Sequence, residues 1–390
     1  MNKIEAIANT PLVQSIVSYF DASAASLVNQ IIEIQQIPAP TFAEANRAAF
    51  IQKRFQEIGL VDVEQDRLHN VYGSLPAHTP SLPSVIVSAH SDTVFPIKTD
   101  LTIRQDGQYV HGPGIGDNST GVGGIIFFAE ALIKFGVDLP ADLWFVSNVG
   151  EEGLGDLRGM RSVVERFGSE ATYLIVEGGL YGQISHQAIG VRRYRINVSA
   201  PGGHSWGSFG NHSAIHILGH LIAAIDKLPV PKRPKTTYNV GFIEGGTSIN
   251  SIAQMAHMLL DLRSEDTGAL EDLVRQVEAL VLQLRHNYDD AIAIDMEPIG
   301  NRPAGKIARD APLIQWADAA LRQAGCRQIF YIASSSDANI PLSRGLNAVC
   351  IGLAESNYAH RLDEYLDPKY LPRGMAQLLL LTLACAGYLE

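Results

Sequence analysis

Four short apolar runs stand out along the chain, each bounded by polar or turn-forming residues. They cover residues 84–88, 143–147, 173–176 and 348–351. Runs of this length without polar alternation are typical of strands buried on both faces, as in a mostly parallel sheet between helices. Apolar residues at helical spacing predict helices over 43–60 and 121–135, and the apolar run 378–389 predicts a buried C-terminal helix. The fold class predicted from these patterns is α/β.

The middle of the chain has a different pattern. Residues 192–199 alternate between polar and apolar side chains, which predicts a strand with one solvent-exposed face. Further strands are predicted over 237–243, 255–262 and 291–297, and helices over 213–228 and 270–285. We therefore expect a smaller α+β domain over 191–302, inserted into a larger domain that is formed by residues 1–190 and 303–390.

Charge and cysteine content exclude several classes of function. The formal net charge of −11 argues against nucleic-acid binding, because phosphates require a basic protein surface. Cys326, Cys350 and Cys385 are scattered and odd in number, so they predict neither a disulfide framework nor a thiolate metal site. Residues 1–20 are too polar for a signal peptide, and the run 378–389 is too short to cross a bilayer. We expect a soluble, cytoplasmic protein that binds no membrane.

Side chains that can bind metals fall where the predicted strands end. His90 follows the first apolar run, the pair Glu151 and Glu152 follows the second, and Glu177 ends the third. The fourth run precedes a loop that carries His360. Because the carboxyl ends of parallel strands meet at one edge of a sheet, we expect these side chains to converge there.

Taken singly, each of these residues has a simpler interpretation. A lone histidine after a strand is more often structural, and adjacent glutamates are normally solvated. Asp117, in the glycine-rich segment 112–121, is by itself an N-cap or turn aspartate. Four independent strands that each deliver an imidazole or a carboxylate to one edge are hard to attribute to chance, so the joint pattern favours a metal site.

The order of these motifs resembles that of a known family over nearly the whole chain. The family is that of the dinuclear-zinc metallopeptidases and deacylases, which includes carboxypeptidase G, peptidase T and acetylornithine deacetylase. The resemblance is carried by His90-Ser-Asp92, Gly116-Asp117-Asn118, Glu151-Glu152-Gly153, Glu177 and His360. It implies a zinc exopeptidase-like catalytic domain over 1–190 and 303–390, and an inserted lid and dimerisation domain over 191–302.

The resemblance also implies how the ligands are shared. Asp117 would bridge two divalent metal ions, His90 and Glu177 would complete one ion, and Glu152 and His360 would complete the other. It further implies a cis peptide bond after Asp117. A set of nitrogen and oxygen ligands without cysteine suits zinc, with cobalt or manganese as alternatives.

Two further residues of the catalytic domain are expected to act on the reaction itself. A metal-activated water needs a group that takes its proton and passes it to the leaving nitrogen, and Glu151 is the candidate general base. Asp92, two residues after His90, can accept the second imidazole N–H and so fix the tautomer of that ligand.

The inserted domain adds candidate substrate-binding residues through the same resemblance. His204, in the segment 201–206, resembles a lid histidine that stabilises the oxyanion, within its own chain or across a homodimer. Asn250 and Arg263 resemble residues that bind the carboxylate or backbone of the substrate, and an arginine fork suits a carboxylate. Residues 334–339 resemble a substrate-facing loop.

We therefore expect a hydrolase that cleaves an amide bond of a small peptide or an N-acyl amino acid. In the family, glutamate at the position of Glu177 tends to accompany carboxypeptidases and deacylases, which favours a substrate with a free carboxylate. A metal- or peptide-binding relative without catalysis is the alternative, disfavoured by the presence of Glu151. A dimetal phosphatase or nuclease is disfavoured by the acidic charge.

Three histidines at helical spacing, His212, His216 and His220, offer a second arrangement that could bind metal. No glutamate of an H-E-x-x-H motif accompanies them, so core or surface histidines are the favoured interpretation.

Overall fold

The computed structural model describes residues 3–288 and 291–389, and the chain divides into two compact units. The larger unit is Met1–Gln187 with Lys306–Glu390, and the smaller unit is Ala188–Gly305. The sequence patterns placed the boundaries at 190/191 and 302/303. The catalytic and lid roles of the two parts stay predictions.

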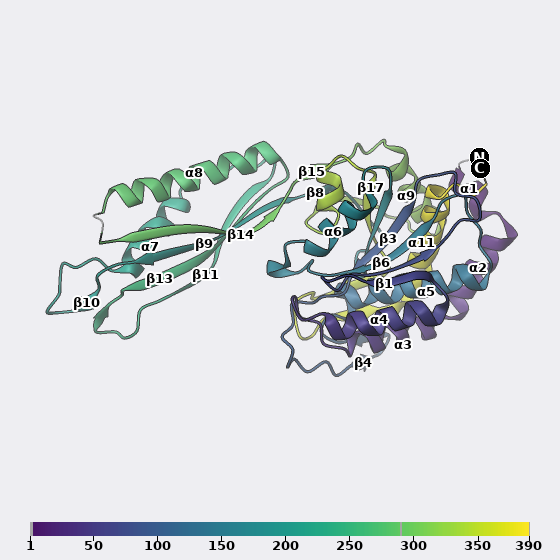
Figure 1. Ribbon diagram of the computed structural model, residues 1–390, viewed down its shortest axis with the longest axis horizontal. Coiled ribbons are helices and arrows are strands. Elements are labelled where there is room, and N and C mark those ends of the chain that lie inside the picture. Colours follow the sequence, from purple (N-terminus) through teal and green to yellow (C-terminus); the bar gives the residue numbers. More distant parts are fainter. Residues whose placement is uncertain (1–2, 289–290, 390) are drawn as a thin grey trace. The chain divides into compact units, whose positions relative to one another are not determined.

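A nine-stranded sheet forms the centre of the larger unit within the described residues (Figure 1). Its strands are β1 (Val61–Gln65), β2 (Val71–Leu75), β3 (Val85–His90), β6 (Leu143–Asn148), β7 (Thr172–Glu177), β8 (Gln183–Ala188), β15 (Gly305–Lys306), β16 (Phe330–Ser334) and β17 (Ala348–Gly352). The order across the sheet is β1-β2-β6-β3-β7-β17-β8-β15, and β16 pairs with β8. The four central strands are parallel, as the apolar runs predict. The predicted α/β fold class is confirmed.

Helices cover this sheet. They are α1 (Lys3–Ala8), α2 (Pro11–Ala22), α3 (Ala24–Gln35), α4 (Ala45–Ile58), α5 (Gly121–Lys134), α6 (Arg158–Phe167), α9 (Pro312–Gln323), α10 (Asn339–Ser343) and α11 (Leu371–Cys385). Side chains of α1–α5, α9 and α11 join alternate strand residues, such as Val87 and Phe145, in one hydrophobic core. The intervening residues, such as Ile86 and Tyr173, are buried on the other face. Burial on both faces explains why these strands show no polar alternation.

A small second sheet in the larger unit carries the loop of His360. Its strands are β4 (Arg104–Asp106), β5 (Tyr109–His111), β18 (Glu355–Asn357) and β19 (Tyr365–Asp367), in the order β18-β19-β5-β4. Strands β18 and β19 are antiparallel, so residues 358–364 form the end of a hairpin.

The smaller unit is an α+β layer. Its elements are β9 (Gly190–Ser199), β10 (Gly203–His204), α7 (Ala214–Ile225), β11 (Thr236–Gly245), β12 (Ser251–Ile252), β13 (Met255–Ser264), α8 (Thr267–His286) and β14 (Ala293–Arg302). Strands β11-β13-β9-β14 form an antiparallel sheet, and α7 and α8 contribute to its core on one face. Buried residues alternate along β13, as expected of a sheet with one open face. Across the described part of the chain, no helix combines the length and the apolar character that a membrane span requires.

A buried arginine ties the N-terminal helices to the sheet edge. Arg47, on α4, is only 2% exposed. Its guanidinium donates to the carbonyl oxygens of Ile37 at 2.8 Å, Ser91 at 2.8 Å and Gln35 at 3.3 Å. The bond to Ser91 holds the chain directly after the last residue of β3. Burial lowers the pKa of Arg47 to about 10, so the group remains charged at neutral pH.

Replacing Arg47 with alanine should destabilise the larger unit by about 3 kcal/mol, because three buried carbonyl groups lose a charged donor. Arg47→Lys should recover little, since an ammonium group cannot reproduce the planar fork. Urea unfolding followed by circular dichroism measures the change. Arg104→Ala is the control, because Arg104 pairs with Asp106 at an exposed site and its loss should be nearly neutral. Equal stability of the two alanine variants would contradict a stabilising role for the three hydrogen bonds of Arg47.

Candidate metal centre

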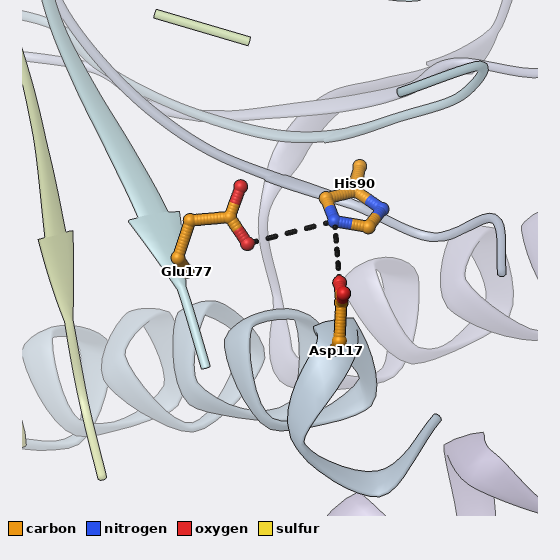
Figure 2. A group of neighbouring side chains, drawn as sticks. All are labelled: His90, Asp117 and Glu177. Carbon is orange, nitrogen blue, oxygen red and sulfur yellow. Dashed lines mark ion pairs between the residues drawn. The ribbon is translucent and has the colours of Figure 1, made fainter. Parts of the chain in front are cut away.

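Two metal-capable side chains end neighbouring strands of the central sheet. His90 is the last residue of β3 and Glu177 is the last residue of β7. The strands are adjacent and parallel, so both side chains emerge at the same edge, and His90 Nε2 lies 3.5 Å from Glu177 Oε2 (Figure 2). This is the convergence that the apolar runs predict.

Asp117 lies between two histidines. It belongs to the turn Ile115–Thr120, directly before α5, and the peptide bond from Asp117 to Asn118 is cis, as the family resemblance implies. Its Oδ1 atom lies 3.1 Å from His90 Nε2, and its Oδ2 atom lies 3.2 Å from His360 Nε2. Glu152 Oε1 also lies 3.2 Å from His360 Nε2. The five predicted ligands therefore come together as two groups that share Asp117.

The donor set fits divalent cations. Within each group the ligand atoms lie within 4.8 Å of one another. A tetrahedral zinc ion with bonds of about 2 Å separates its ligands by about 3.3 Å, which is the spacing found between each histidine and its carboxylates. Glu152 Oε1 is buried and accepts no hydrogen bond from the described residues, although His360 Nε2 is close. A cation between these two atoms would satisfy both.

The pKa shifts of these side chains indicate a site that favours positive charge. Burial opposes protonation of His90, but Glu177 and Asp117 hold its pKa well above the usual value. The carboxylates of Asp117 and Glu152, each 3.2 Å from His360 Nε2, raise the pKa of His360 to about 10. Burial and the neighbouring Asp117 raise the pKa of Glu152. These carboxylates favour protonated imidazoles, so a cation that binds here competes with protons.

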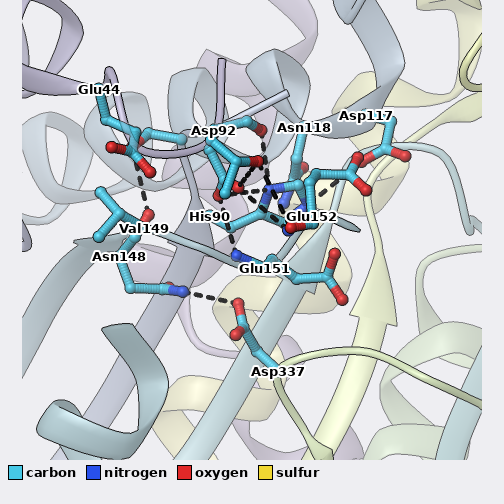
Figure 3. Close-up of polar contacts among 12 residues, drawn as sticks. Glu44, His90, Asp92, Asp117, Asn118, Asn148, Val149, Glu151, Glu152 and Asp337 are labelled. Carbon is cyan, nitrogen blue, oxygen red and sulfur yellow. Dashed lines mark hydrogen bonds and ion pairs between the residues drawn. The ribbon is translucent and has the colours of Figure 1, made fainter. Parts of the chain in front are cut away.

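Asp92 has more contacts in the site than the sequence-based expectation assigns to it. The nearest acceptor to His90 Nδ1 is the Asp92 carbonyl oxygen, at 3.1 Å, whereas the carboxylate Oδ1 lies at 3.6 Å. The carboxylate is engaged elsewhere: Oδ1 accepts from the Glu151 amide, and Oδ2 accepts from the Glu152 amide and the Thr41 hydroxyl (Figure 3). Asp92 thus fixes the backbone of the Glu151–Glu152 pair, and either acceptor leaves His90 Nε2 facing Asp117 and Glu177.

The predicted base lies in the same buried loop. Glu151 is 6% exposed and follows β6, with its amide held by Asp92 at 3.0 Å. Beneath the loop, Asp337 accepts a hydrogen bond from Asn148 Nδ2 at 2.7 Å (Figure 3). Asp337 is completely buried, and burial raises its pKa to about 7. Asp337, in the segment 334–339, therefore contacts the end of β6, directly before the loop of Glu151.

Asn118 has a structural role that sequence analysis did not assign, although it stands within a quoted motif. Its side-chain amide donates to Val176 O at 2.9 Å, and its Oδ1 atom accepts from the amides of Gly178 at 2.8 Å and Gly121 at 3.0 Å. The side chain therefore joins the turn of Asp117 to the end of β7. It fixes the separation of Asp117 and Glu177.

The predicted residues of the smaller unit are described within that unit only. His204 lies on β10, which pairs with β12, and the Ser205 amide donates to Asn250 O at 2.9 Å, so the His204 and Asn250 segments are neighbours. Arg263, on β13, donates to both carboxylate oxygens of Asp261, at 2.7 Å and 3.1 Å. Its fork is therefore already engaged by an acidic neighbour. The substrate-binding roles of His204, Asn250 and Arg263 stay predictions.

The histidines at helical spacing lie on the surface of the smaller unit. His212, His216 and His220 are exposed, and only His216 and His220 belong to α7. The groups of possible metal ligands among the described residues include none of them.

Known proteins resemble this chain in sequence and in fold. The protein YqjE of Bacillus subtilis is 22% identical over 340 residues, which cover 83% of this chain and 88% of that protein. A probable carboxypeptidase of Aspergillus clavatus is 28% identical over 284 residues, 65% of this chain and 60% of the relative. The crystal structure of a tripeptidase from Staphylococcus aureus shares the fold, with a TM-score of 0.78, 19% identity and coverage of 93% and 99%.

The profile of Peptidase family M20/M25/M40 matches residues 86–384. This match covers most of the chain and includes all five predicted metal ligands. It confirms the resemblance found in the sequence and the prediction of a hydrolase of the amidohydrolase and exopeptidase class. This chain is therefore a member of Peptidase family M20/M25/M40.

Proposed function

We propose that this chain is a dimetal-dependent hydrolase that cleaves an amide bond of a small peptide or an N-acyl amino acid. The observation that carries the proposal is the position of Asp117, whose two carboxylate oxygens each face a different histidine. His90, Asp117 and Glu177 would hold one cation, and Asp117, Glu152 and His360 the other. Zinc is the favoured ion for these nitrogen and oxygen donors, with cobalt and manganese as alternatives.

The residues of the centre divide the chemical work. Two divalent cations bound there would acidify a water molecule and polarise the amide carbonyl. Glu151 takes the proton from the attacking water and delivers it to the leaving nitrogen. The Asp92 carboxylate accepts hydrogen bonds from the amides of Glu151 and Glu152 at 3.0 Å each. These bonds fix the backbone positions of the proposed base and of the neighbouring ligand relative to each other.

The substrate is proposed to carry a free carboxylate beside the cleaved bond. Glu177, rather than aspartate, favours carboxypeptidases and deacylases by the family resemblance, and the relative from Aspergillus clavatus is named a probable carboxypeptidase. Arg263 and Asn250 are the candidate groups for that carboxylate. The pairing of Arg263 with Asp261 uses two of its five N–H groups, which leaves others for a substrate.

A homodimer through the smaller unit is part of the proposal. Trp206 and Phe209 are 88% and 91% exposed, and Phe242 and Ile243 are exposed on β11. Strand β11 is an edge of its sheet, so it has unpaired backbone groups that another strand can bind. His204 lies in the segment of Trp206 and would stabilise the oxyanion in its own chain or in the partner's site. A cytoplasmic location, proposed from the scattered cysteines, completes the assignment.

Purified without chelator, the protein should contain about two divalent metal ions per chain, and chelation should abolish amide hydrolysis. Adding zinc, cobalt or manganese should restore it, because the ligands remain in place. Elemental analysis and a screen of dipeptides, tripeptides and N-acyl amino acids measure both properties. A protein without metal whose activity no ion restores would overturn the dimetal proposal.

Glu151→Gln should retain both metal ions but lose kcat by about 10²–10⁴-fold, because the amide cannot accept the proton of the water. Glu152→Gln, in contrast, should lower metal content. Steady-state kinetics with elemental analysis separates the two effects. Glu165→Gln, an exposed carboxylate on α6, is the control and should behave as the native protein. Near-native turnover of Glu151→Gln would place the base elsewhere.

His204→Ala should lower kcat by about 10²–10³-fold with little change in KM, because an oxyanion donor acts in the transition state. His220→Ala, at an exposed position on α7 of the same unit, should have no effect. The measurement is kcat and KM on the best substrate of the screen. A rise in KM alone would assign His204 to substrate binding instead.

A further inference from the structure

The hairpin that carries His360 also contributes a carboxylate, Glu364, that binds backbone amides of the turn that contains Asp117. Glu364 follows His360 by four residues, yet its side chain is completely buried. Its Oε2 atom accepts from the Gly114 amide at 2.9 Å, and its Oε1 atom accepts from the amides of Gly116 and Asp117 at 2.8 Å each. The Glu364 backbone carbonyl accepts a fourth bond, from the Gly112 amide at 2.9 Å.

The turn of Asp117 is shaped to receive this anion. Gly114 has a φ of 71°, which glycine adopts without strain, and this turns three amides of the segment toward one point. Converging backbone amides of this kind form an anion-binding nest. Gly116 lies so close to the hairpin that a Cβ atom there would be 2.5 Å from Ser356 and 3.0 Å from Glu364 Oε1. The backbone of the turn therefore packs directly against side chains of the hairpin.

Glu364 thereby couples two ligands of one group. It is attached to His360 through the chain and to Asp117 through the amide of that residue. His360 itself is 55% exposed and has a φ of 67°, so neither burial nor a strand holds its side chain in place. The distance of 3.2 Å between His360 Nε2 and Asp117 Oδ2 consequently depends on the position of the hairpin relative to the turn, which the bonds of Glu364 set.

The other group has separate supports. His90 and Glu177 end adjacent parallel strands, and Asn118 joins the turn of Asp117 to the end of β7. None of these bonds involves Glu364. Different contacts therefore position the two groups of ligands, although both groups contain Asp117.

From this asymmetry we propose that Glu364 is a positioning residue chiefly for the ion held by Asp117, Glu152 and His360. The ion held by His90, Asp117 and Glu177 depends on it less, because β3, β7 and Asn118 also position its ligands. The inference rests on the proposed dimetal function. It makes a residue outside the ligand set control the affinity of one ion of the pair.

The test compares metal binding by the metal-free forms of the native protein, Glu364→Ala and Glu364→Gln. Zinc titrated against a chromophoric competitor gives the Kd of each site, and elemental analysis gives the stoichiometry. Glu364→Ala should weaken one site by about 10–100-fold, the usual effect of removing an outer-shell partner, and weaken the other site much less. Glu364→Gln should fall between, because its oxygen still accepts from Gly116 and Asp117 whereas its NH₂ group faces the Gly114 amide.

A neighbouring charge provides the matched control. Asp363 is exposed and pairs with Arg361, so Asp363→Asn removes the same charge one residue away without touching the turn, and both Kd values should stay native. Two native Kd values in Glu364→Ala would overturn the inference. So would equal weakening of both sites in the isosteric Glu364→Gln, because that result indicates general loss of structure. Fewer than two ions in the native protein would instead overturn the dimetal function itself.

Discussion

Asp117 presents one carboxylate oxygen to His90 and the other to His360, and the arrangement of the sheet edge depends on this sharing. The shared carboxylate fixes how far apart the two ligand groups lie. It also gathers like charges, because Glu152 and Glu177 lie beside it. Carboxylates at such short range repel one another in a buried site, so the cluster is stable only with compensating positive charge. Protonated imidazoles can supply that charge, and in the proposed enzyme bound cations would supply it.

Different structural features position the different ligands. His90 and Glu177 are positioned by strands, which the parallel sheet holds in register. Asp117 and Glu152 lie on loops, and their backbone amides donate hydrogen bonds to the carboxylates of Glu364 and Asp92 respectively, which position them. A buried carboxylate that accepts hydrogen bonds from several amides can fix the backbone as precisely as a strand does, since each bond constrains one peptide plane. Loops can therefore carry precise ligands when an anion lies behind them.

The sequence predicted those parts of the molecule that leave a local signal. The runs at 85–88 and 173–176 are apolar because both faces of the sheet are covered, and the ligands at their ends follow from strand polarity. The contact of Asp92 with two amides, and that of Glu364 with the turn of Asp117, join segments far apart in the chain. Such contacts leave no periodicity, so only the folded structure reveals them. The roles of the lid residues remain sequence-based, since the smaller unit is described by itself.

The point at which the smaller unit is inserted affects how much the larger unit depends on it. The polypeptide leaves the larger unit along β8 and returns along β15, and these strands are hydrogen-bonded neighbours at one margin of the nine-stranded sheet as far as the chain is described. A tight turn can join two such ends, so the excursion between them adds no gap to the sheet. Shortening, exchanging or removing the smaller unit should therefore leave the strands that carry the candidate metal ligands uninterrupted.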